Sequence, residues 1–245
     1  MIDRTSGHDD RGVTELVGFV IIFGIIISSV GILYMTGFSA MGDVQDHEQT
    51  RNAERAMDAL GENLNDVVRS EGVTYRAGEL SLRSGTISSN STGTWVNVSV
   101  DGQNNPVATA NGTFSYESGE TTLYYEGGAI TRDTAAGGWP ISDPPIRCRS
   151  DTAIVSLVDL QVDESSVTAD GTRRITATQT GTSVETFDDE TVELEINSPR
   201  EGAWQRSLTN AGWTDEGSGQ FSCDPSDSAG DEVIVRTTAV QIDYS

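Results

Sequence analysis

A run of twenty residues without a charged side chain constrains this chain more than any other feature of its sequence. The run extends from Leu16 to Met35 and is apolar apart from glycine, serine and one tyrosine. In an α-helix, twenty residues that rise 1.5 Å each extend about 30 Å, the thickness of the hydrocarbon core of a bilayer. A soluble core helix is seldom apolar on every side over such a length. The sequence therefore predicts a transmembrane hydrophobic helix over residues 13–36.

The residues that precede this helix do not resemble an ordinary secretory signal. Such a signal has a basic start, a shorter apolar region and a cleavage site between small residues. Here the first twelve residues carry Asp3, Asp9 and Asp10 against Arg4 and Arg11, and the apolar region is too long. We therefore treat residues 1–12 as a short polar leader of another kind.

Four residues at the junction, Arg11, Gly12, Val13 and Glu15, are followed directly by the apolar run. This arrangement resembles the class III signal of archaeal type IV pilins and pilin-like proteins, over about residues 1–40. The resemblance implies that a prepilin peptidase cuts between Gly12 and Val13 on the cytoplasmic side and leaves the helix on the mature protein. It also implies like subunits as partners through the helix, and assembly into a surface filament. The glutamate would be third in the mature chain, where bacterial pilins place it fifth. The alternative is an uncut single-pass anchor.

Two further features of the helix bear on its partners. The carboxylate of Glu15 is costly at the edge of the hydrocarbon region unless it is paired or reaches the interface. Cleavage would give Val13 a positive α-amine as a partner, and otherwise Glu15 extends into the head groups. Gly24, Ser28 and Gly31 share one helix face, where small residues let another helix approach closely.

A second apolar pattern follows in the segment 37–70, which we expect to be a helical stalk. Its apolar residues recur at spacings of four and three, typical of a helix with one buried face: Ala53, Met57, Leu60, Leu64 and Val67. The pattern predicts that the membrane helix continues to about Ser70. The alternative is a separate short helix, with Gly37 or Gly42 breaking the continuity.

Residues 71–245 change to short alternating runs separated by glycine, serine, asparagine and aspartate, typical of strands and turns. Strands are expected at 79–83, 95–100, 113–117, 121–126, 152–162, 174–180, 191–196 and 232–244. The Gly/Pro-rich stretch 135–145 could separate two sub-sheets. We expect an α+β protein, in which the long N-terminal helix is followed by a mostly antiparallel, β-sandwich-like outer domain.

The charge of the chain points to its surroundings. There are 38 acidic and 15 basic residues and no lysine, so the net charge is −23. Nucleic acid is therefore not expected as a partner. Multimolar salt shortens the screening length to about 3 Å, which removes most of the self-repulsion. The composition predicts an extreme halophile, with an acidic secreted domain as the alternative.

The two cysteines, Cys148 and Cys223, lie far downstream of the predicted anchor. On an outward-facing domain, such a pair is more often bonded than free. We expect a disulfide, with two isolated buried thiols as the alternative.

The residue inventory argues against most catalytic chemistry. The histidines are His8 and His47, and beyond residue 70 there is neither histidine nor lysine, so nucleophile–base arrangements that need them cannot be built there. Carboxylate pairs such as Asp188-Asp189 or Asp163-Glu164 carry little information in so acidic a chain. We expect no enzyme activity, no cofactor and no metal. Four tryptophans, at 95, 139, 204 and 213, are expected in the core or at strand edges rather than in a binding patch.

Three N-glycosylation acceptors begin at Asn90, Asn97 and Asn111. Asn97 alternates with the valines of its expected strand, so we expect its side chain to be accessible. Their presence is consistent with a surface glycoprotein.

These observations lead to three functional hypotheses. The first is a pilin-like, membrane-anchored cell-surface structural or adhesion subunit that is processed at Gly12/Val13. The second is an uncleaved single-pass membrane protein whose extracellular β-domain binds a ligand or partner. The third and least favoured is an anchored carboxylate-dependent hydrolase.

Overall fold

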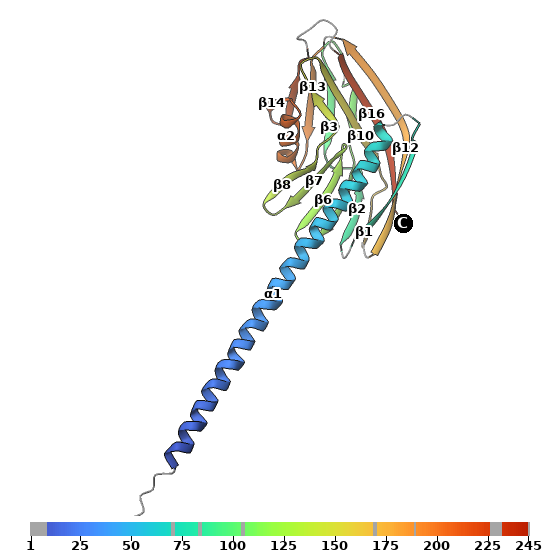
Figure 1. Cartoon of the computed structure of the whole chain (residues 1–245). Coiled ribbons are helices and arrows are strands. Elements are labelled where there is room, and N and C mark those ends of the chain that lie inside the picture. Colours follow the sequence, from blue (N-terminus) through green and yellow to red (C-terminus); the bar gives the residue numbers. More distant parts are fainter. Residues whose placement is uncertain are drawn as a thin grey trace, which may run out of the picture. The chain divides into compact units, whose positions relative to one another are not determined.

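The computed structural model describes residues 9–69, 72–82, 85–103, 106–168, 171–188, 190–225 and 232–244; within these ranges, the side chains of 9–13, 37–47, 49, 81 and 82 are not described (Figure 1). Two compact units are present, one ending at Gln49 and one beginning at Thr50. Helix α1, Asp9–Arg69, has 61 residues and contributes to both units. The helix assignment includes Gly37 and Gly42, so neither glycine ends the helix.

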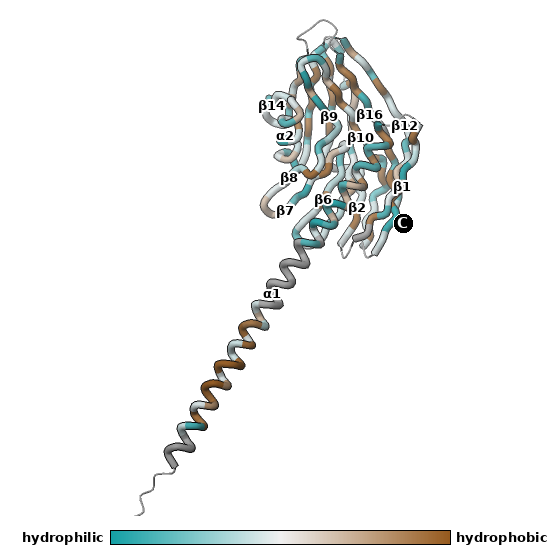
Figure 2. The backbone as a smooth tube through the Cα atoms, in the orientation of Figure 1, coloured by the Kyte–Doolittle hydropathy of each residue, from teal (hydrophilic) through white to brown (hydrophobic). Residues whose placement is uncertain are grey.

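In the first unit, α1 carries the apolar stretch that the sequence predicted. The stretch Thr14–Thr36 has 23 residues, its most apolar 18-residue window has a mean hydropathy of 2.8, and none of that window is buried in the structure. Figure 2 shows it as the most hydrophobic segment of the helix. The helix is long and apolar enough to cross a membrane, as a membrane anchor or a signal sequence would be.

Besides the second half of α1, the described residues of the second unit form sixteen strands in three sheets and a short helix. The first sheet has the order β1 (Tyr75–Leu82), β12 (Gly171–Asp188), β16 (Glu232–Tyr244), β10 (Thr152–Gln161) and β9 (Ile146–Cys148). The second has the order β11 (Ser165–Thr168), β2 (Thr86–Asn90), β5 (Thr113–Ser118), β6 (Thr121–Glu126), β7 (Ala129–Thr134) and β8 (Gly137–Ser142). The third has the order β14 (Thr214–Gly217), β15 (Gln220–Cys223), β13 (Val192–Asn197), β3 (Trp95–Val100) and β4 (Ala108–Ala110). Helix α2 is Glu201–Asn210.

The strand pairs are antiparallel apart from β10 and β16, which run parallel. The predicted α+β class, with an N-terminal apolar helix and mostly antiparallel sheets, is therefore confirmed. Strands β10 and β16 lie in the interior of the first sheet, where apolar side chains on alternate positions are buried.

Two hydrophobic clusters form the interior of the second unit. The first cluster joins the second half of α1 to the first and second sheets. The second cluster joins the first sheet to the third sheet and α2. Strands β10 and β16 contribute to both: Val158 and Val240 belong to the first cluster, whereas Val155 and Val235 belong to the second. The first sheet is therefore common to both cores.

The second half of α1 packs as its sequence pattern predicted. The five residues of the apolar stripe are all buried and belong to the first cluster: Ala53, Met57, Leu60, Leu64 and Val67. Because these side chains complete the core of the sheets, the compact unit begins at Thr50 rather than at residue 71. The residues 50–69 are therefore part of the β-domain and not a free stalk.

Two expectations about the β-domain need correction. The Gly/Pro-rich stretch 135–145 is more than a linker, because it contains β8, which pairs with β7 inside the second sheet, before the chain continues to β9 of the first sheet. Helix α2 was not expected from the sequence. Its buried residues Ala203, Trp204, Ser207 and Leu208 share one face of the helix, and Trp204 and Leu208 belong to the second cluster.

The predicted disulfide between Cys148 and Cys223 is present, with a Cα–Cα distance of 5.8 Å. Cys148 ends β9 in the first sheet and Cys223 ends β15 in the third sheet. The bond closes a sequence separation of 75 residues and links the two sheets that enclose the second cluster.

Candidate functional site

The apolar stretch of α1 is the strongest candidate for a functional surface. Its large side chains are exposed on every side, among them Phe19, Leu33 and Met35. Soluble proteins seldom leave so large an apolar surface in contact with water. The stretch therefore needs a covering, which lipid or another apolar helix can supply.

Polar side chains within this stretch are arranged as an apolar surrounding requires. The hydroxyl of Ser29 donates to the carbonyl oxygen of Ile25 at 2.7 Å, and that of Thr36 donates to the carbonyl oxygen of Ile32 at 2.9 Å. Each hydroxyl is thus satisfied by its own helix, four residues earlier. This arrangement removes the cost of placing an unpaired hydroxyl in hydrocarbon.

The residues predicted to take part in processing and helix packing all lie on α1. Arg11, Gly12 and Val13 are in its first turns, but their side chains lie outside the described set, and Glu15 is exposed. Ser28 is exposed, and a Cβ atom added at Gly24 or Gly31 would meet nothing within 4 Å. The face that carries these small residues is thus open to another helix.

The second half of α1 is held on the second sheet by a buried hydrogen-bonded pair. The hydroxyl of Tyr125 donates to Oδ1 of Asn65 at 2.8 Å, and Nδ2 of Asn65 donates to the carbonyl oxygen of Gly128 at 3.1 Å. Burial raises the pKa of Tyr125 well above its ordinary value, so this phenol stays protonated. Both functional groups of the asparagine are therefore satisfied inside the core.

Two arginines add contacts to the same part of the helix. Arg132 on β7 pairs with Glu54 at 2.7 Å, in a partly exposed position. Arg236 on β16 donates to the carbonyl oxygen of Val68 at 3.0 Å. Because the last carbonyl groups of a helix lack partners within it, this guanidinium satisfies one of them and complements the negative end of the helix dipole.

Among the described residues, the buried charged side chains Glu126 and Arg200 form one network at the end of β6. Nε of Arg200 donates to Oε2 of Glu126 at 3.0 Å and Nη2 donates to Oε1 at 2.5 Å, with both side chains buried. The hydroxyls of Thr94 and Thr113 also donate to this carboxylate, each at 2.6 Å. The guanidinium of Arg200 lies over the ring of Tyr124, 4.0 Å from its centre. A buried pair of this kind is stable only because its remaining hydrogen bonds are satisfied. The network thus holds the start of β3, the second sheet and the start of α2 together.

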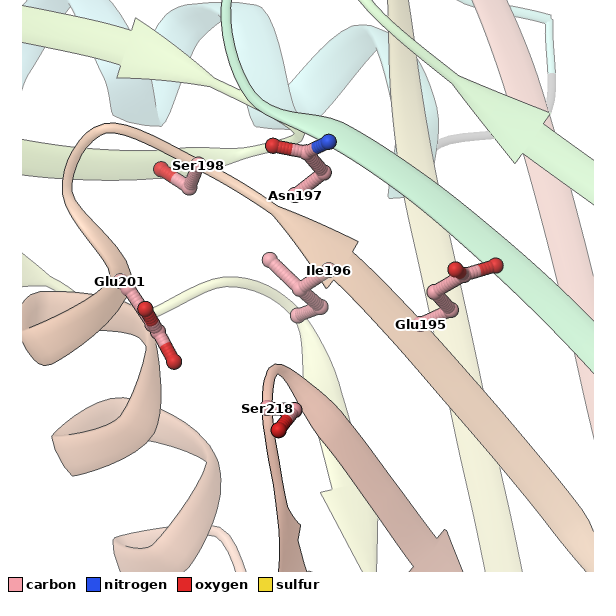
Figure 3. A pocket seen from close by; sticks show the side chains of 6 residues that line it. All are labelled: Glu195, Ile196, Asn197, Ser198, Glu201 and Ser218. Atoms are coloured by element: carbon pink, nitrogen blue, oxygen red, sulfur yellow. The ribbon is translucent and has the colours of Figure 1, made fainter.

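An open pocket of about 230 Å³ lies where β13 meets α2 and the turn between β14 and β15 (Figure 3). Its lining consists of Glu195, Ile196, Asn197, Ser198, Glu201 and Ser218. Figure 3 shows the carboxylates of Glu195 and Glu201 on opposite sides of Ile196. Among the described residues, no group of three or more His, Cys, Asp or Glu could hold a metal ion. The pocket therefore presents two separate acidic groups to solvent rather than an assembled centre.

Comparison with known proteins places the chain in a family. A family model described as a family of unknown function, DUF7289, matches residues 11–243. The chain belongs to this family. No curated protein and no solved structure matches it. The matched region begins at Arg11, so the apolar stretch and the β-domain are together part of what defines a DUF7289 chain.

The three glycosylation acceptors of this DUF7289 protein lie in different surroundings. Asn90 is exposed at the end of β2, and Asn111 is half-buried ahead of β5. Asn97 is only 9% exposed, so the expectation that it is accessible was wrong. It lies on β3, an interior strand of the third sheet, with Glu195 of β13 and Thr109 of β4 directly beside it.

The tryptophans do not form a common patch in this DUF7289 protein. Trp204 and Trp213 are buried in the second cluster, as expected for core residues. Trp139 on β8 is exposed, and the guanidinium of Arg206 lies 4.1 Å from the centre of its ring. The sequence did not single out Glu126, Arg200, Asn65 or Tyr125, which carry the buried polar contacts of the domain.

Proposed function

We propose that this DUF7289 protein is a pilin-like, membrane-anchored subunit of the cell surface, with a structural or adhesive role. In this proposal a prepilin peptidase cuts between Gly12 and Val13, and the apolar helix stays on the mature chain. One observation carries the proposal: a single helix, α1, combines a fully exposed apolar stretch directly after Arg11-Gly12-Val13 with a second half that packs on β-sheets.

In this proposal the apolar stretch is covered first by lipid and then by other subunits. Before assembly, lipid would cover it, since its length matches the hydrocarbon core. After assembly, the helices of like subunits would cover it, approaching along the open face of Gly24, Ser28 and Gly31. In either state Glu15 is near the end of the stretch, where the new α-amine of Val13 would be its closest cationic partner.

The extent of the family match supports retention of the helix. A signal sequence that is removed during export contributes nothing to the mature protein, whereas the DUF7289 match joins the apolar helix to the β-domain from residue 11 to residue 243.

Three features support an extracellular β-domain. The disulfide Cys148–Cys223 suits an oxidising compartment. The two clusters enclosed between sheets suit a β-sandwich-like domain that is stable by itself at a cell surface. The net charge of −23, without lysine, suits a surface exposed to the multimolar salt of a halophilic archaeon.

The mature N-terminus tests the proposal. We expect mass spectrometry of the full chain, taken from the membranes of an archaeal host that has a prepilin peptidase, to find a chain that begins at Val13. The variant Gly12→Asp should keep the leader, because a carboxylate replaces the small residue at the cut. The matched control Gly7→Asp places the same charge within the leader, and its product should still begin at Val13. A mature wild-type chain would remove the pilin-like interpretation if it retained Met1–Gly12. So would a chain that starts at Asp43, as cleavage after the small residues of Ala40-Met41-Gly42 by a secretory signal peptidase would give.

The uncleaved single-pass protein remains the second candidate because of one structural feature. Strand β12 pairs with β1 only as far as Thr178, whereas its ladder with β16 continues to Asp188. Within the described residues, no strand ladder occupies the other edge of β12 from Thr180 onward, and Val184 there is 50% exposed. An open edge of this kind can bind the strand of a partner. A membrane protein with the leader intact would favour this candidate.

A further inference from the structure

The three Asn-x-Ser/Thr acceptors have equivalent sequences, so their surroundings in the fold decide which of them can be modified. Transfer of an N-linked glycan requires that an enzyme reach the asparagine amide and the hydroxyl two residues later at the same time. The whole triplet therefore has to be accessible, and not the asparagine alone.

The triplet Asn90-Ser91-Thr92 meets this requirement. All three residues are exposed; Asn90 is the last residue of β2, opposite Thr113 of β5, and Ser91 and Thr92 follow the end of the strand. Oδ1 of Asn90 accepts hydrogen bonds from the backbone N–H and the hydroxyl of Thr92, at 2.8 and 2.7 Å. The amide oxygen and the hydroxyl of the acceptor are thus already side by side. Among the described residues, Nδ2 of Asn90 has no hydrogen-bond partner.

The triplet Asn97-Val98-Ser99 does not meet it. All three residues are within β3, which is bonded to β13 on one side and to β4 on the other. Nδ2 of Asn97, the atom that would carry the sugar, donates to Oε2 of Glu195 at 3.4 Å. A glycan on this atom would require the third sheet to open.

The triplet Asn111-Gly112-Thr113 is held in place at every residue. The backbone N–H of Asn111 donates to Oδ1 of Asp159 at 3.0 Å, and its carbonyl oxygen accepts from the N–H of Leu160 at 2.9 Å. Gly112 has a φ of +90°, and a Cβ atom there would lie 2.4 Å from the carbonyl oxygen of Leu160. The hydroxyl of Thr113 is used by the buried Glu126 network, and this residue is only 6% exposed. An enzyme cannot reach this hydroxyl without breaking the network.

We propose that Asn90 carries an N-linked glycan and that Asn97 and Asn111 stay unmodified in the folded protein. The donor is an oligosaccharide attached through phosphate to a membrane lipid. Nδ2 of Asn90 forms a bond to the anomeric carbon, the bond from that carbon to the phosphate oxygen breaks, the lipid phosphate leaves with the electron pair, and the amide nitrogen loses a proton. This inference rests on the proposed function, because the donor and its transferase act on the outer side of the membrane.

Glycopeptide mass spectrometry of the full chain tests the inference. The protein is purified from the membranes of an archaeal host that glycosylates its own surface proteins. We expect the peptide that contains Asn90 to carry glycan and the peptides that contain Asn97 and Asn111 to be bare. The variants Asn90→Gln and Thr92→Ala should each reduce the glycan to an undetectable level. The control Ser91→Ala removes a neighbouring hydroxyl but keeps the acceptor, and should retain the glycan.

Protease treatment of intact cells separates this inference from the proposed function. A β-domain that is cleaved from outside but bare at Asn90 would overturn the glycan assignment alone. Glycan at Asn97 or Asn111 in the folded protein would overturn it as well, since it would show that the fold does not select the site. A β-domain protected from the protease would overturn the surface location and the glycan assignment together.

Discussion

The two halves of helix α1 are built from similar apolar residues but are covered in different ways. In the residues 14–36 the apolar side chains occupy every side of the helix and are exposed. In the residues 50–69 they occupy one stripe, at spacings of three and four, and are buried against the first and second sheets. The difference teaches that the period of the apolar residues, and not their number, tells whether a helix is covered by its own chain or by its surroundings.

The two halves also differ in where their polar side chains find hydrogen-bond partners. In the first half, hydroxyls bond to carbonyl groups of their own helix, as Ser29 does. In the second half, polar side chains bond to the sheets, as Asn65 and Glu54 do. The polar groups named in the first half therefore need no hydrogen-bond partner from the β-domain, whereas the second half is one of the structural elements of that domain.

The largest expected effect comes from removing the second half of the helix. A fragment of residues 50–245 should fold, because it retains the whole compact unit. A fragment of residues 71–245 should not fold, because it lacks the buried stripe of α1. At about 2 kcal/mol for each large side chain, that stripe contributes on the order of 10 kcal/mol, which is comparable to the entire stability of a typical domain.

Near-ultraviolet circular dichroism and size-exclusion chromatography of both fragments in multimolar KCl provide the measurement. The salt is needed in both cases because the chain is strongly acidic. A monomeric 71–245 fragment with the same spectrum as the 50–245 fragment would break the comparison, since the helix would then be dispensable for the β-domain.

Two methionines of the same helix allow a sharper comparison. Met57 is 0% exposed in the first cluster, whereas Met35 is 74% exposed in the apolar stretch. Met57→Ala should lower the free energy of unfolding of the β-domain by about 2–5 kcal/mol, because it leaves a cavity. Met35→Ala should change it by no more than about 0.5 kcal/mol. Denaturant titration of each full chain in mild detergent, followed by the fluorescence of the buried tryptophans, measures both. Equal effects of the two substitutions would contradict the conclusion that only the second half of α1 belongs to the core of the β-domain.

The parts of the fold that could be predicted are those signalled by a few residues of strong physical preference. The period of the stripe from Ala53 to Val67 predicted its buried face, and the alternation around Val98 and Leu194 predicted strands that the structure contains. The disulfide was predictable because the chain has only two cysteines. In each case, the residues that carry the signal are few and their physical requirement is strong.

What could not be predicted depended on neighbours from distant parts of the chain. Alternation placed Asn97 opposite the valines, but its burial follows from strands β13 and β4 on either side, and no local pattern states which strands are interior. Glu126 and Arg200 are 74 residues apart, and in so acidic a chain one glutamate among many gives no sign that it is buried. Helix α2 had a weak signal in the spacing of Trp204 and Leu208, but ten residues are too few to outweigh the surrounding strands.

The smallest effect concerns the hydrogen bond that joins the second half of α1 to the second sheet. Tyr125→Phe should lower the free energy of unfolding by about 1–3 kcal/mol at neutral pH, because Oδ1 of Asn65 loses its donor while it stays buried. Tyr124→Phe is the matched control. It removes the neighbouring hydroxyl but keeps the ring under Arg200, and should change stability by no more than about 0.5 kcal/mol.

The difference in stability between the wild type and Tyr125→Phe depends on pH. Burial raises the pKa of Tyr125 in the folded state, whereas in the unfolded state the phenol titrates near its ordinary value of about 10. Its contribution to stability is therefore complete below about pH 10 and is lost as the pH rises further, because only the unfolded chain releases the proton. The loss amounts to about 1.4 kcal/mol per pH unit, and Tyr125→Phe does not undergo it. Denaturant titrations of both full chains at pH 8, 10 and 11 (values that span the unfolded pKa of about 10) should show the wild-type advantage shrinking above pH 10. If the difference in free energy of unfolding between the wild type and Tyr125→Phe stays constant across this range, the phenol is not buried against the helix. The hydrogen bond to Asn65 would then not distinguish the second half of α1 from the first.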